Sequence, residues 1–172
     1  MPMYLYLGDI TRMETDAIVN AAGTDLRRCP GICDAIFAAA DTEELERACR
    51  KLGRCRIGQA VATPGCELPC RYIIHVAGPG WYGGEPRERF LLAGCYQNAL
   101  HKAYLCSCRR VAVPLIFSGD CHMPRAASLR VAGAAIADFC QRHPSMEVTL
   151  VLYRQSIYDM AKRILGWEDA PS

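Results

Sequence analysis

Short apolar runs alternate along the chain with longer segments of helical spacing, and this alternation constrains the fold more than any other feature. Several of the runs are apolar on both faces, which is typical of sheet strands that helices cover on both sides. The runs predict strands at residues 3–7, 17–22, 72–77, 111–117 and 147–153, with a weaker sixth at 60–63. We therefore expect a three-layer α/β/α fold with a mixed, mostly parallel central sheet of about six strands.

Four segments between these runs have the spacing of amphipathic helices. They cover residues 34–53, 85–106, 124–142 and 156–166. In the second segment, the residues expected to form a buried stripe are Phe90, Leu91, Ala93, Gly94, Asn98, Leu100 and Leu105. The last residues, "EDAPS", predict a frayed tail.

The chain is long enough to bury the core of one domain. It has 172 residues, of which 51% are hydrophobic, so we expect a single domain over residues 1–172 with its core at about residues 4–166. The formal net charge is +2, from 20 Lys and Arg against 18 Asp and Glu. Such a balance gives no support to direct nucleic-acid binding, and we expect a monomer.

No apolar run approaches the length of a membrane span, and the amino end lacks the pattern of a secretory signal. We therefore expect a cytoplasmic protein that has no membrane partner. The chain has 11 cysteines, an odd number, so disulfides could not pair them all. In that compartment the thiols are expected to be reduced, and most are expected to be small core or surface residues.

In open α/β sheets, ligands bind beyond the carboxyl ends of the strands, so the loops that follow strands are the candidate site. Three such loops stand out, at residues 7–11, 21–34 and 117–124. Gly31 and Ile32 lead into a helix whose free amides favour a phosphate, and Ser118 and Gly119 suit a second amide nest. Two facing nests suit a diphosphate, although ordinary strand-to-helix turns have a similar composition.

Four motifs occur in order along the chain: "GDIT", "DAIVNAA", "IGQAVATPGCELPCRYIIHVAGPGW" and "AVPLIFSGDCHMP". Their order, spacing and strand context resemble the macrodomain, the ADP-ribose-binding family, over roughly Tyr4 to Tyr158. The resemblance implies ADP-ribose or an ADP-ribosylated protein as the partner, and no cofactor or metal. It also implies that His75, inside a strand, is a hydrogen-bonded core histidine and not a catalytic one.

The resemblance assigns ligand-binding roles position by position. Asp9 would accept a hydrogen bond from the adenine amine, beside the backbone amide of Ile10. Asn20 matches the first asparagine of the family's N-A-A-N motif, where it holds the loop and reaches the ligand. The loops over the diphosphate would contain the remaining ligand-binding residues: Gly31, Ile32, Ser118, Gly119, Asp120, Cys121 and His122.

Three positions depart from the family where it contacts the distal ribose. Gly23 stands where the second asparagine holds that sugar, and Cys33 stands where hydrolases of the best-known branch have an aspartate that positions water. Cys121 stands where an aromatic ring usually packs. A protonated thiol is a poor replacement for a carboxylate that orients water. The residues for the adenine end are all present.

Three residues are the candidate replacements in catalysis. Asp34 follows Cys33 and points about 100° away around a helix, so it requires a shift in loop register. Asp120 and His122 form the most suitable pair, because histidine titrates near neutral pH. Against this, the carboxylate of Asp120 would repel a neighbouring pyrophosphate unless its side chain turned outward. The alternative is that Asp120 and His122 are both solvent-exposed residues without a catalytic role.

We expect a binder of ADP-ribose or a closely related nucleotide diphosphate, in the role of a reader of ADP-ribosylation. The first alternative is a hydrolase of mono-ADP-ribosylated protein or O-acetyl-ADP-ribose with atypical catalytic residues. The second is a diverged scaffold with a metal or redox role, which would use Cys29, Cys33, Cys121 and His122. The C-x₃-C spacing is not a standard zinc spacing, so the first two functions are favoured.

Overall fold

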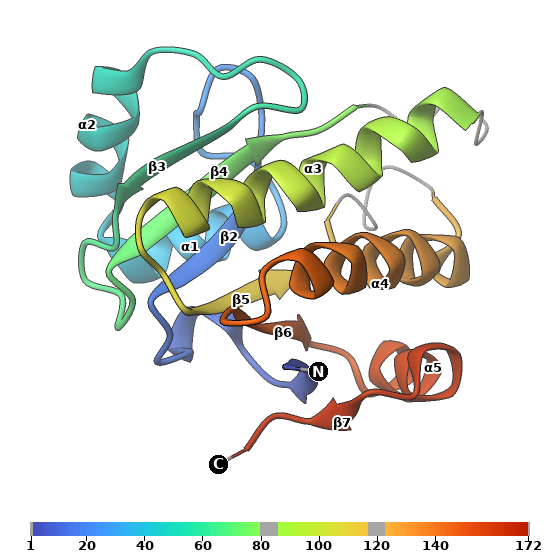
Figure 1. Cartoon of the computed structure of the whole chain (residues 1–172). Coiled ribbons are helices and arrows are strands. Elements are labelled where there is room, and N and C mark those ends of the chain that lie inside the picture. Colours follow the sequence, from blue (N-terminus) through green and yellow to red (C-terminus); the bar gives the residue numbers. More distant parts are fainter. Residues whose placement is uncertain (1, 80–85, 117–122, 172) are drawn as a thin grey trace.

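The computed structural model describes residues 2–79, 86–116 and 123–171. One sheet contains the seven strands of this part of the chain: β1 (Met3–Leu7), β2 (Ala17–Ala22), β3 (Ala60–Pro64), β4 (Tyr72–Ala77), β5 (Arg110–Pro114), β6 (Glu147–Leu152) and β7 (Glu168–Asp169). The strand order is β3-β4-β2-β5-β6-β1-β7 (Figure 1). All neighbouring pairs are parallel except β3 and β4. The prediction of a mixed, mostly parallel sheet is confirmed.

The sheet has one strand more than expected, because the carboxy-terminal tail adds β7 at its edge. Glu168 and Asp169 pair with Tyr4 and Leu5 of β1. The amide of Ala170 then donates to the carbonyl oxygen of Leu5 at 2.9 Å. The prediction of a frayed tail is wrong for these residues, since backbone hydrogen bonds to an unpaired sheet edge hold them.

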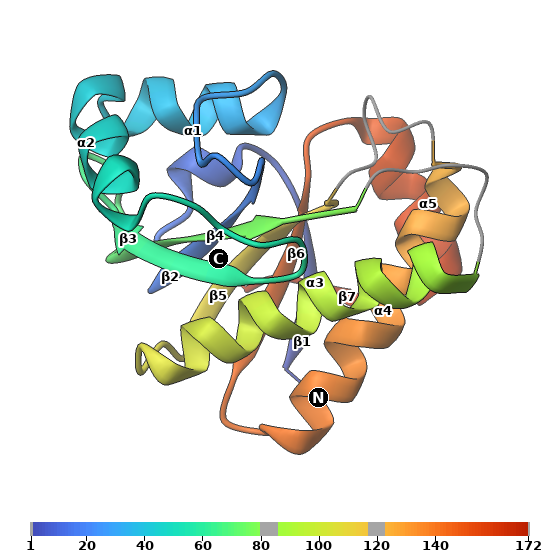
Figure 2. The same ribbon diagram turned by 90° about the horizontal axis from the view of Figure 1, so that it is seen from above.

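Helices cover both faces of the sheet. The helical segments are η1 (Ile10–Arg12), α1 (Ile32–Ala40), α2 (Thr42–Leu52), α3 (Pro86–Leu105), α4 (Arg125–Arg142) and α5 (Gln155–Leu165). Helices α1 and α2 lie on one face, and α3, α4 and α5 lie on the other (Figure 2). The expected three-layer α/β/α architecture is confirmed.

The strands supply alternate side chains to two separate cores. In β2, Val19 packs in the core beneath α3 and α4, whereas Ile18 packs in the core beneath α1. In β4, Ile74 packs in the core beneath α3 and α4, and Ile73 packs in the core beneath α1. All four side chains are at most 1% exposed. This explains why the strands are apolar on both faces.

The segment 34–53, predicted as one helix, forms two. Asp41 separates α1 from α2, with a φ of 77° that no helical residue adopts. Its carboxylate accepts hydrogen bonds from the amides of Glu43 and Glu44, at 3.1 and 3.3 Å. The local hydrogen bonds of this aspartate therefore end one helix and begin the next.

The stripe expected to be buried on α3 is wrong at three positions. Phe90 and Leu105 are 78% and 63% exposed, and Asn98 is exposed. Leu100 is buried as expected, and the rest of the buried apolar face is formed by Leu92, Cys95, Tyr96, Ala99 and Ala103. The Tyr96 hydroxyl accepts a hydrogen bond from the Ile116 amide at 2.8 Å, which fixes this face toward the sheet. Apolar residues occur nearly all around α3, so its periodicity does not select a single face.

Apart from the two-residue β7, five parallel strands bring their carboxyl ends to one edge of the sheet. These ends are Leu7, Ala22, Ala77, Pro114 and Leu152. The loops that leave β1 and β2 therefore open at the same edge, where ligands bind in sheets of this kind.

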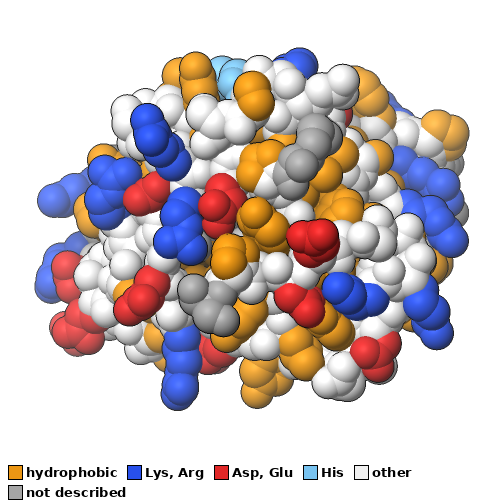
Figure 3. Space-filling view, turned by 60° about the horizontal axis from the view of Figure 1, so that its bottom comes forward, with side chains coloured by type: hydrophobic (Ala, Val, Ile, Leu, Met, Phe, Trp, Pro, Cys, Tyr) orange, Lys and Arg blue, Asp and Glu red, His pale blue; other side chains and the backbone are white. Residues whose placement is uncertain are grey.

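No helix in the described part of the chain is long and apolar enough to cross a membrane. On the face drawn in Figure 3, basic and acidic side chains are interspersed and do not form separate fields. The surface there agrees with the small net charge of +2.

Candidate functional site

The loop after β1 presents the carboxylate of Asp9. Its Oδ1 accepts hydrogen bonds from the amide and the hydroxyl of Thr11, at 2.9 and 2.7 Å, and thereby caps η1. Its Oδ2 lies 3.9 Å from Nε of Arg12, whose side chain is 87% exposed. This long, exposed ion pair is weak, so Oδ2 keeps capacity to accept a further hydrogen bond.

Ile10 follows Asp9 and anchors this loop. Its side chain is 3% exposed and packs in the core beneath α1. The carbonyl oxygen of Ile10 accepts from the amide of Met13 at 3.2 Å, which closes the turn of η1. The apolar anchor and the capped turn together fix the direction of the Asp9 backbone.

At the end of β2, Asn20 and His75 form a buried polar pair. Nδ2 of Asn20 lies 3.0 Å from Nδ1 of His75, and Oγ1 of Thr63 lies 2.9 Å from Nε2 of the same ring. Burial lowers the pKa of His75 to about 4, so the ring is neutral at neutral pH. The prediction that His75 is a satisfied core histidine is confirmed. Its partner Thr63 was not predicted, because only the pairing of β3 with β4 brings the two together.

The side-chain oxygen of Asn20 has no partner among the described residues. Asn20 is 0% exposed, and its Oδ1 is buried without a hydrogen bond. An unpaired buried acceptor is costly, so this atom calls for a donor from a water molecule or a ligand. Because Asn20 lies near the carboxyl end of β2, such a donor would be located at the candidate site.

The loop after β2 ends in an open helix N-terminus. Gly31 precedes α1 with a φ of 85°, which favours glycine, and no atom lies within 4 Å of where its Cβ would stand. The amides of Ile32, Cys33 and Asp34 in its first turn have no intrahelical acceptors, and no side chain of the described residues caps α1. Free amides and the positive end of the helix dipole favour an anion here.

Two thiols lie behind this turn. Sγ of Cys33 lies 3.8 Å from Nδ2 of Asn20, and Sγ of Cys29 lies 3.9 Å from the carbonyl oxygen of Ala21. The interaction with Cys29 lowers the pKa of Cys33 to about 7 although burial opposes the shift. The same interaction raises the pKa of Cys29. Position 33 therefore faces Asn20, as a site residue would, but carries sulfur.

Asp34 points away from this cluster. Its Oδ1 lies 2.5 Å from Nε of Arg28, and its side chain is 54% exposed. The guanidinium of Arg28 also donates to the hydroxyl of Thr42 at 3.1 Å. Asp34 is thus engaged at the surface, and it forms no hydrogen bond with Asn20 or Cys33. Arg28 was not predicted as its partner, and its position within a loop gave no signal.

The remaining predicted site residues lie outside the described part of the chain. They are Ser118, Gly119, Asp120, Cys121 and His122. Their proximity to Gly31, and their roles in binding or catalysis, stay predictions. Among the residues that are described, no group of three or more His, Cys, Asp or Glu side chains is arranged to hold a metal ion.

The sequence profile of the Macro domain family matches residues 19–132. The chain belongs to the Macro domain family. A relative from Cronobacter sakazakii, named O-acetyl-ADP-ribose deacetylase, is 36% identical to this macrodomain over 167 residues, which are 94% of this chain and 92% of the relative.

Solved macrodomain structures have the same fold. The Oceanobacillus iheyensis macrodomain with ADP is 31% identical, with a TM-score of 0.89, and the match covers 94% of this chain and 88% of that one. The Trypanosoma brucei macrodomain in complex with ADP-ribose is 26% identical, with a TM-score of 0.87, and the match covers 96% and 69% of the two chains.

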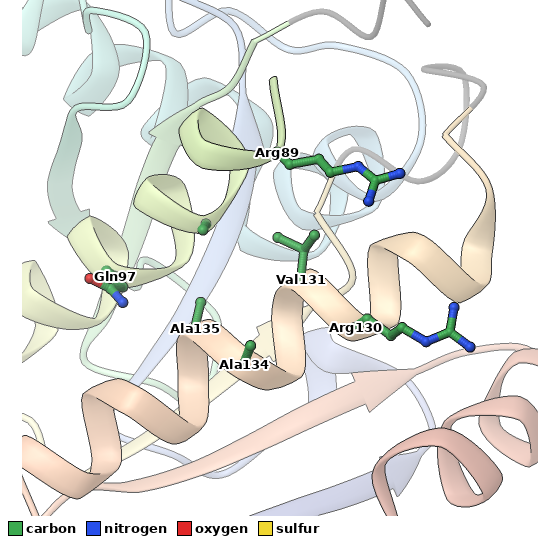
Figure 4. A pocket seen from close by; sticks show the side chains of 7 residues that line it. Arg89, Gln97, Arg130, Val131, Ala134 and Ala135 are labelled. Atoms are coloured by element: carbon green, nitrogen blue, oxygen red, sulfur yellow. The ribbon is translucent and has the colours of Figure 1, made fainter. Parts of the chain in front are cut away.

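The macrodomain also has an open groove of about 370 Å³ between α3 and α4. Arg89 and Arg130 extend from the two helices toward the same side of it, above an apolar floor that includes Val131 (Figure 4). The lining is Arg89, Ala93, Gln97, Arg130, Val131, Ala134 and Ala135, and it includes none of the predicted site residues that the structure describes. The groove is therefore separate from the described part of the strand-exit site.

Proposed function

We propose that this macrodomain binds ADP-ribose, free or attached to a protein, at the carboxyl edge of its sheet. One observation supports this most strongly: the Asp9 carboxylate and the uncapped start of α1 open at the same edge of one parallel sheet. An acceptor for an amine and a cradle for an anion are what an adenine nucleotide diphosphate requires. The related macrodomain structures contain ADP and ADP-ribose.

In the proposed complex, Oδ2 of Asp9 accepts the exocyclic amine of adenine, and the amide of Ile10 donates to the ring. The diphosphate lies against the amides that follow Gly31. The loop of residues 118–122 completes the cradle from the opposite side. Asn20 Oδ1, which is buried and unpartnered among the described residues, accepts a hydrogen bond from a ligand hydroxyl or a bound water.

The proposal favours binding over catalysis. Cys33 faces Asn20 at 3.8 Å, and its sulfur cannot supply the two carboxylate oxygens that orient a water molecule. Gly23 has no side chain with which to hold the distal ribose. The role that fits best is a reader of ADP-ribosylation.

The test is calorimetry of ADP-ribose binding to Asp9→Ala. Removal of a charged acceptor costs about 1.5 to 3 kcal/mol, so the affinity should fall about tenfold or more. Thr11→Val removes only the hydroxyl that donates to Oδ1 and keeps the carboxylate, so it should bind almost normally. Glu14→Ala removes an exposed carboxylate of the same segment and is the matched control. Equal affinity of Asp9→Ala and the unmodified protein would contradict the assignment.

A second candidate function is hydrolysis of ADP-ribose esters, which the name of the Cronobacter sakazakii relative favours. Asp34, Asp120 and His122 are then the proposed catalytic residues, although Asp34 would first have to leave Arg28. Release of ADP-ribose from a mono-ADP-ribosylated protein separates the two functions. A reader binds the modified protein and leaves its ADP-ribose attached, whereas a hydrolase releases the ADP-ribose.

A further inference from the structure

The chain contains two C-x₃-C pairs, and only one of them adjoins the proposed ligand site. Cys29 and Cys33 both lie against the end of β2: Cys29 against the carbonyl oxygen of Ala21, and Cys33 against the side-chain amide of Asn20. Because Asn20 and Ala21 are consecutive, both thiols lie against the same short stretch of β2, and the interaction between them raises the pKa of Cys29 and lowers that of Cys33. This contact joins two residues that flank the Gly31 turn.

The surroundings of Cys33 stabilise a thiolate. The interaction with Cys29 and the hydrogen bond from Nδ2 of Asn20 lower the pKa of Cys33 to about 7, whereas in its protonated form the Cys33 thiol donates to the carbonyl oxygen of Arg27 at 3.8 Å. Cys33 also lies in the first turn of α1, where the helix dipole favours negative charge. Near neutral pH the pair therefore holds one proton between two sulfurs. Cys29 is half-buried and Cys33 is covered, so a small oxidant meets Cys29 first.

The other pair, Cys66 and Cys70, has the same spacing, but its surroundings raise the pKa of both thiols. Burial raises the pKa of Cys66, which also faces the Glu44 carboxylate, and burial raises the pKa of Cys70 to about 11. Neither thiol donates to the other. Cys66 is half-buried like Cys29, so the second pair is a natural control for both spacing and exposure.

We propose that Cys29 and Cys33 form a reversible disulfide when the protein meets a peroxide, and that this bond weakens binding at the adjoining anion cradle. The second half of this statement rests on the proposed function, whereas the first does not. The thiol pair is thus a modification site and a redox control of ligand binding.

The chemistry balances with hydrogen peroxide as the oxidant. The Cys33 thiolate takes the proton of Cys29 as the Cys29 sulfur attacks a peroxide oxygen, the O–O bond breaks, and hydroxide leaves. Cys29 is then a sulfenic acid and Cys33 a thiol. Cys33 gives its proton to the hydroxide and attacks the Cys29 sulfur, so that the S–S bond forms as the S–O bond breaks. The two sulfurs lose two electrons in total, and the peroxide is reduced to water and hydroxide.

The bond would change the backbone that carries the proposed anion cradle. A disulfide holds its sulfurs about 2 Å apart, well inside hydrogen-bond contact, so the residues between them must move. Those residues are Pro30, Gly31 and Ile32, and Gly31 already has a φ of 85°. Amides that bind a phosphate need close and directed approach, so a displaced turn binds it less well.

The first experiment needs no ligand. Reduced protein is treated briefly with hydrogen peroxide, free thiols are alkylated, and the tryptic peptides are weighed. Cys29 and Cys33 fall together in peptide 29–47, and Cys66 and Cys70 fall together in peptide 57–71. We expect peptide 29–47 to lose two hydrogen atoms at least about tenfold faster than peptide 57–71, and to regain them with dithiothreitol. Equal rates in the two peptides, or no disulfide in 29–47, would overturn the proposal.

Two matched variants locate the effect. Cys29→Ser should abolish the disulfide, whereas Cys66→Ser, at a thiol of similar exposure, should leave it unchanged. Calorimetry of ADP-ribose on reduced, oxidised and re-reduced protein then tests the control of binding. We expect the oxidised form to bind at least about tenfold more weakly, and the re-reduced form to recover. An unchanged affinity after complete oxidation would overturn the regulatory half alone. Failure of the reduced protein to bind would overturn the proposed function, with the peptide result unaffected.

Discussion

Asn20 and His75 are 55 residues apart in the sequence, yet Nδ2 of one lies 3.0 Å from Nδ1 of the other. The two residues are opposite each other in the parallel pairing of β2 with β4. Nδ1 accepts from Asn20, so the ring proton is on Nε2 and is donated to Oγ1 of Thr63. This chain of hydrogen bonds ties together three strands directly beneath the loop that carries Gly31.

The neutral state of His75 makes stability depend on pH. Burial lowers its pKa from 6.5 to about 4, so the unfolded chain takes up a proton before the folded one does. The stabilisation is fully present above pH 6.5 and is lost as the pH falls toward 4, by about 3 kcal/mol in total. Urea unfolding across this range measures it. His75→Gln should remove this dependence, whereas His101→Gln, at an exposed ring, should retain it. An unmodified protein whose stability does not change in this range would contradict the buried neutral ring.

Bulk and charge at Gly31 should abolish ADP-ribose binding. Gly31→Glu places a carboxylate over the free amides of α1, where it repels the diphosphate and fills the approach. The positive φ adds a strain of about 1 kcal/mol to the folded state. Gly53→Glu is the matched control, because Gly53 has a φ of 81° and equally open space but ends α2. Both variants should lose similar stability by thermal melting, and only Gly31→Glu should lose binding. Normal binding by Gly31→Glu would place the ligand elsewhere.

The distal-ribose contacts can be restored by a double change. The unmodified protein should bind ADP within about tenfold of ADP-ribose and release ADP-ribose from aspartate or glutamate esters slowly or not at all, since catalysis requires an oriented sugar. Gly23→Asn with Cys33→Asp should raise both the preference for ADP-ribose and the rate. An asparagine fits at 23, because its Cβ meets only Oδ1 of the exposed Asp25, at 3.3 Å. An aspartate at 33 would lie beside Nδ2 of Asn20.

The control for that double change is Gly23→Ala with Cys33→Ser, which alters the same positions without supplying an amide or a carboxylate. Calorimetry with ADP and ADP-ribose, and a release assay on a mono-ADP-ribosylated protein, compare the two. Rapid release by the unmodified protein would sink this prediction and would direct attention to Asp34, Asp120 and His122.

Asp41 should reveal its two functions through a series of substitutions. Asp41→Ala loses the cap of α2, worth about 1 kcal/mol, and keeps the strain of a φ of 77°. Asp41→Gly loses the cap but relieves the strain, and Asp41→Asn retains both a capping oxygen and tolerance of positive φ. Denaturant midpoints should therefore fall in the order Asn, Gly, Ala. Alanine equal to asparagine would mean that neither the cap nor the backbone angle contributes.

Much of the fold follows from patterns that are local in the sequence. Strands apolar on both faces require cover on both faces, so the alternation of strands and helices predicts the three layers. Loops after parallel strands share an edge, so Asp9 and Gly31 were predicted to open at one edge of the sheet, as they do. Local patterns do not predict the structure where the same residues are compatible with two local conformations. Asp41 followed by Glu44 is a helix-start signal, but the helical spacing continues through it, so the sequence is compatible both with one helix and with the break between α1 and α2.

The sequence by itself determined the architecture, the family and the loops that form the candidate site, because each depends on residues close together in the chain. Only the tertiary structure decided which side chains meet: Asn20 with His75 and Thr63, Cys29 with Cys33, and Arg28 with Asp34. Such contacts depend on strand register and on the path of the loop after β2. Register is fixed by the packing of the whole sheet, so a difference of one residue would turn Asn20 to the other face without altering any local pattern.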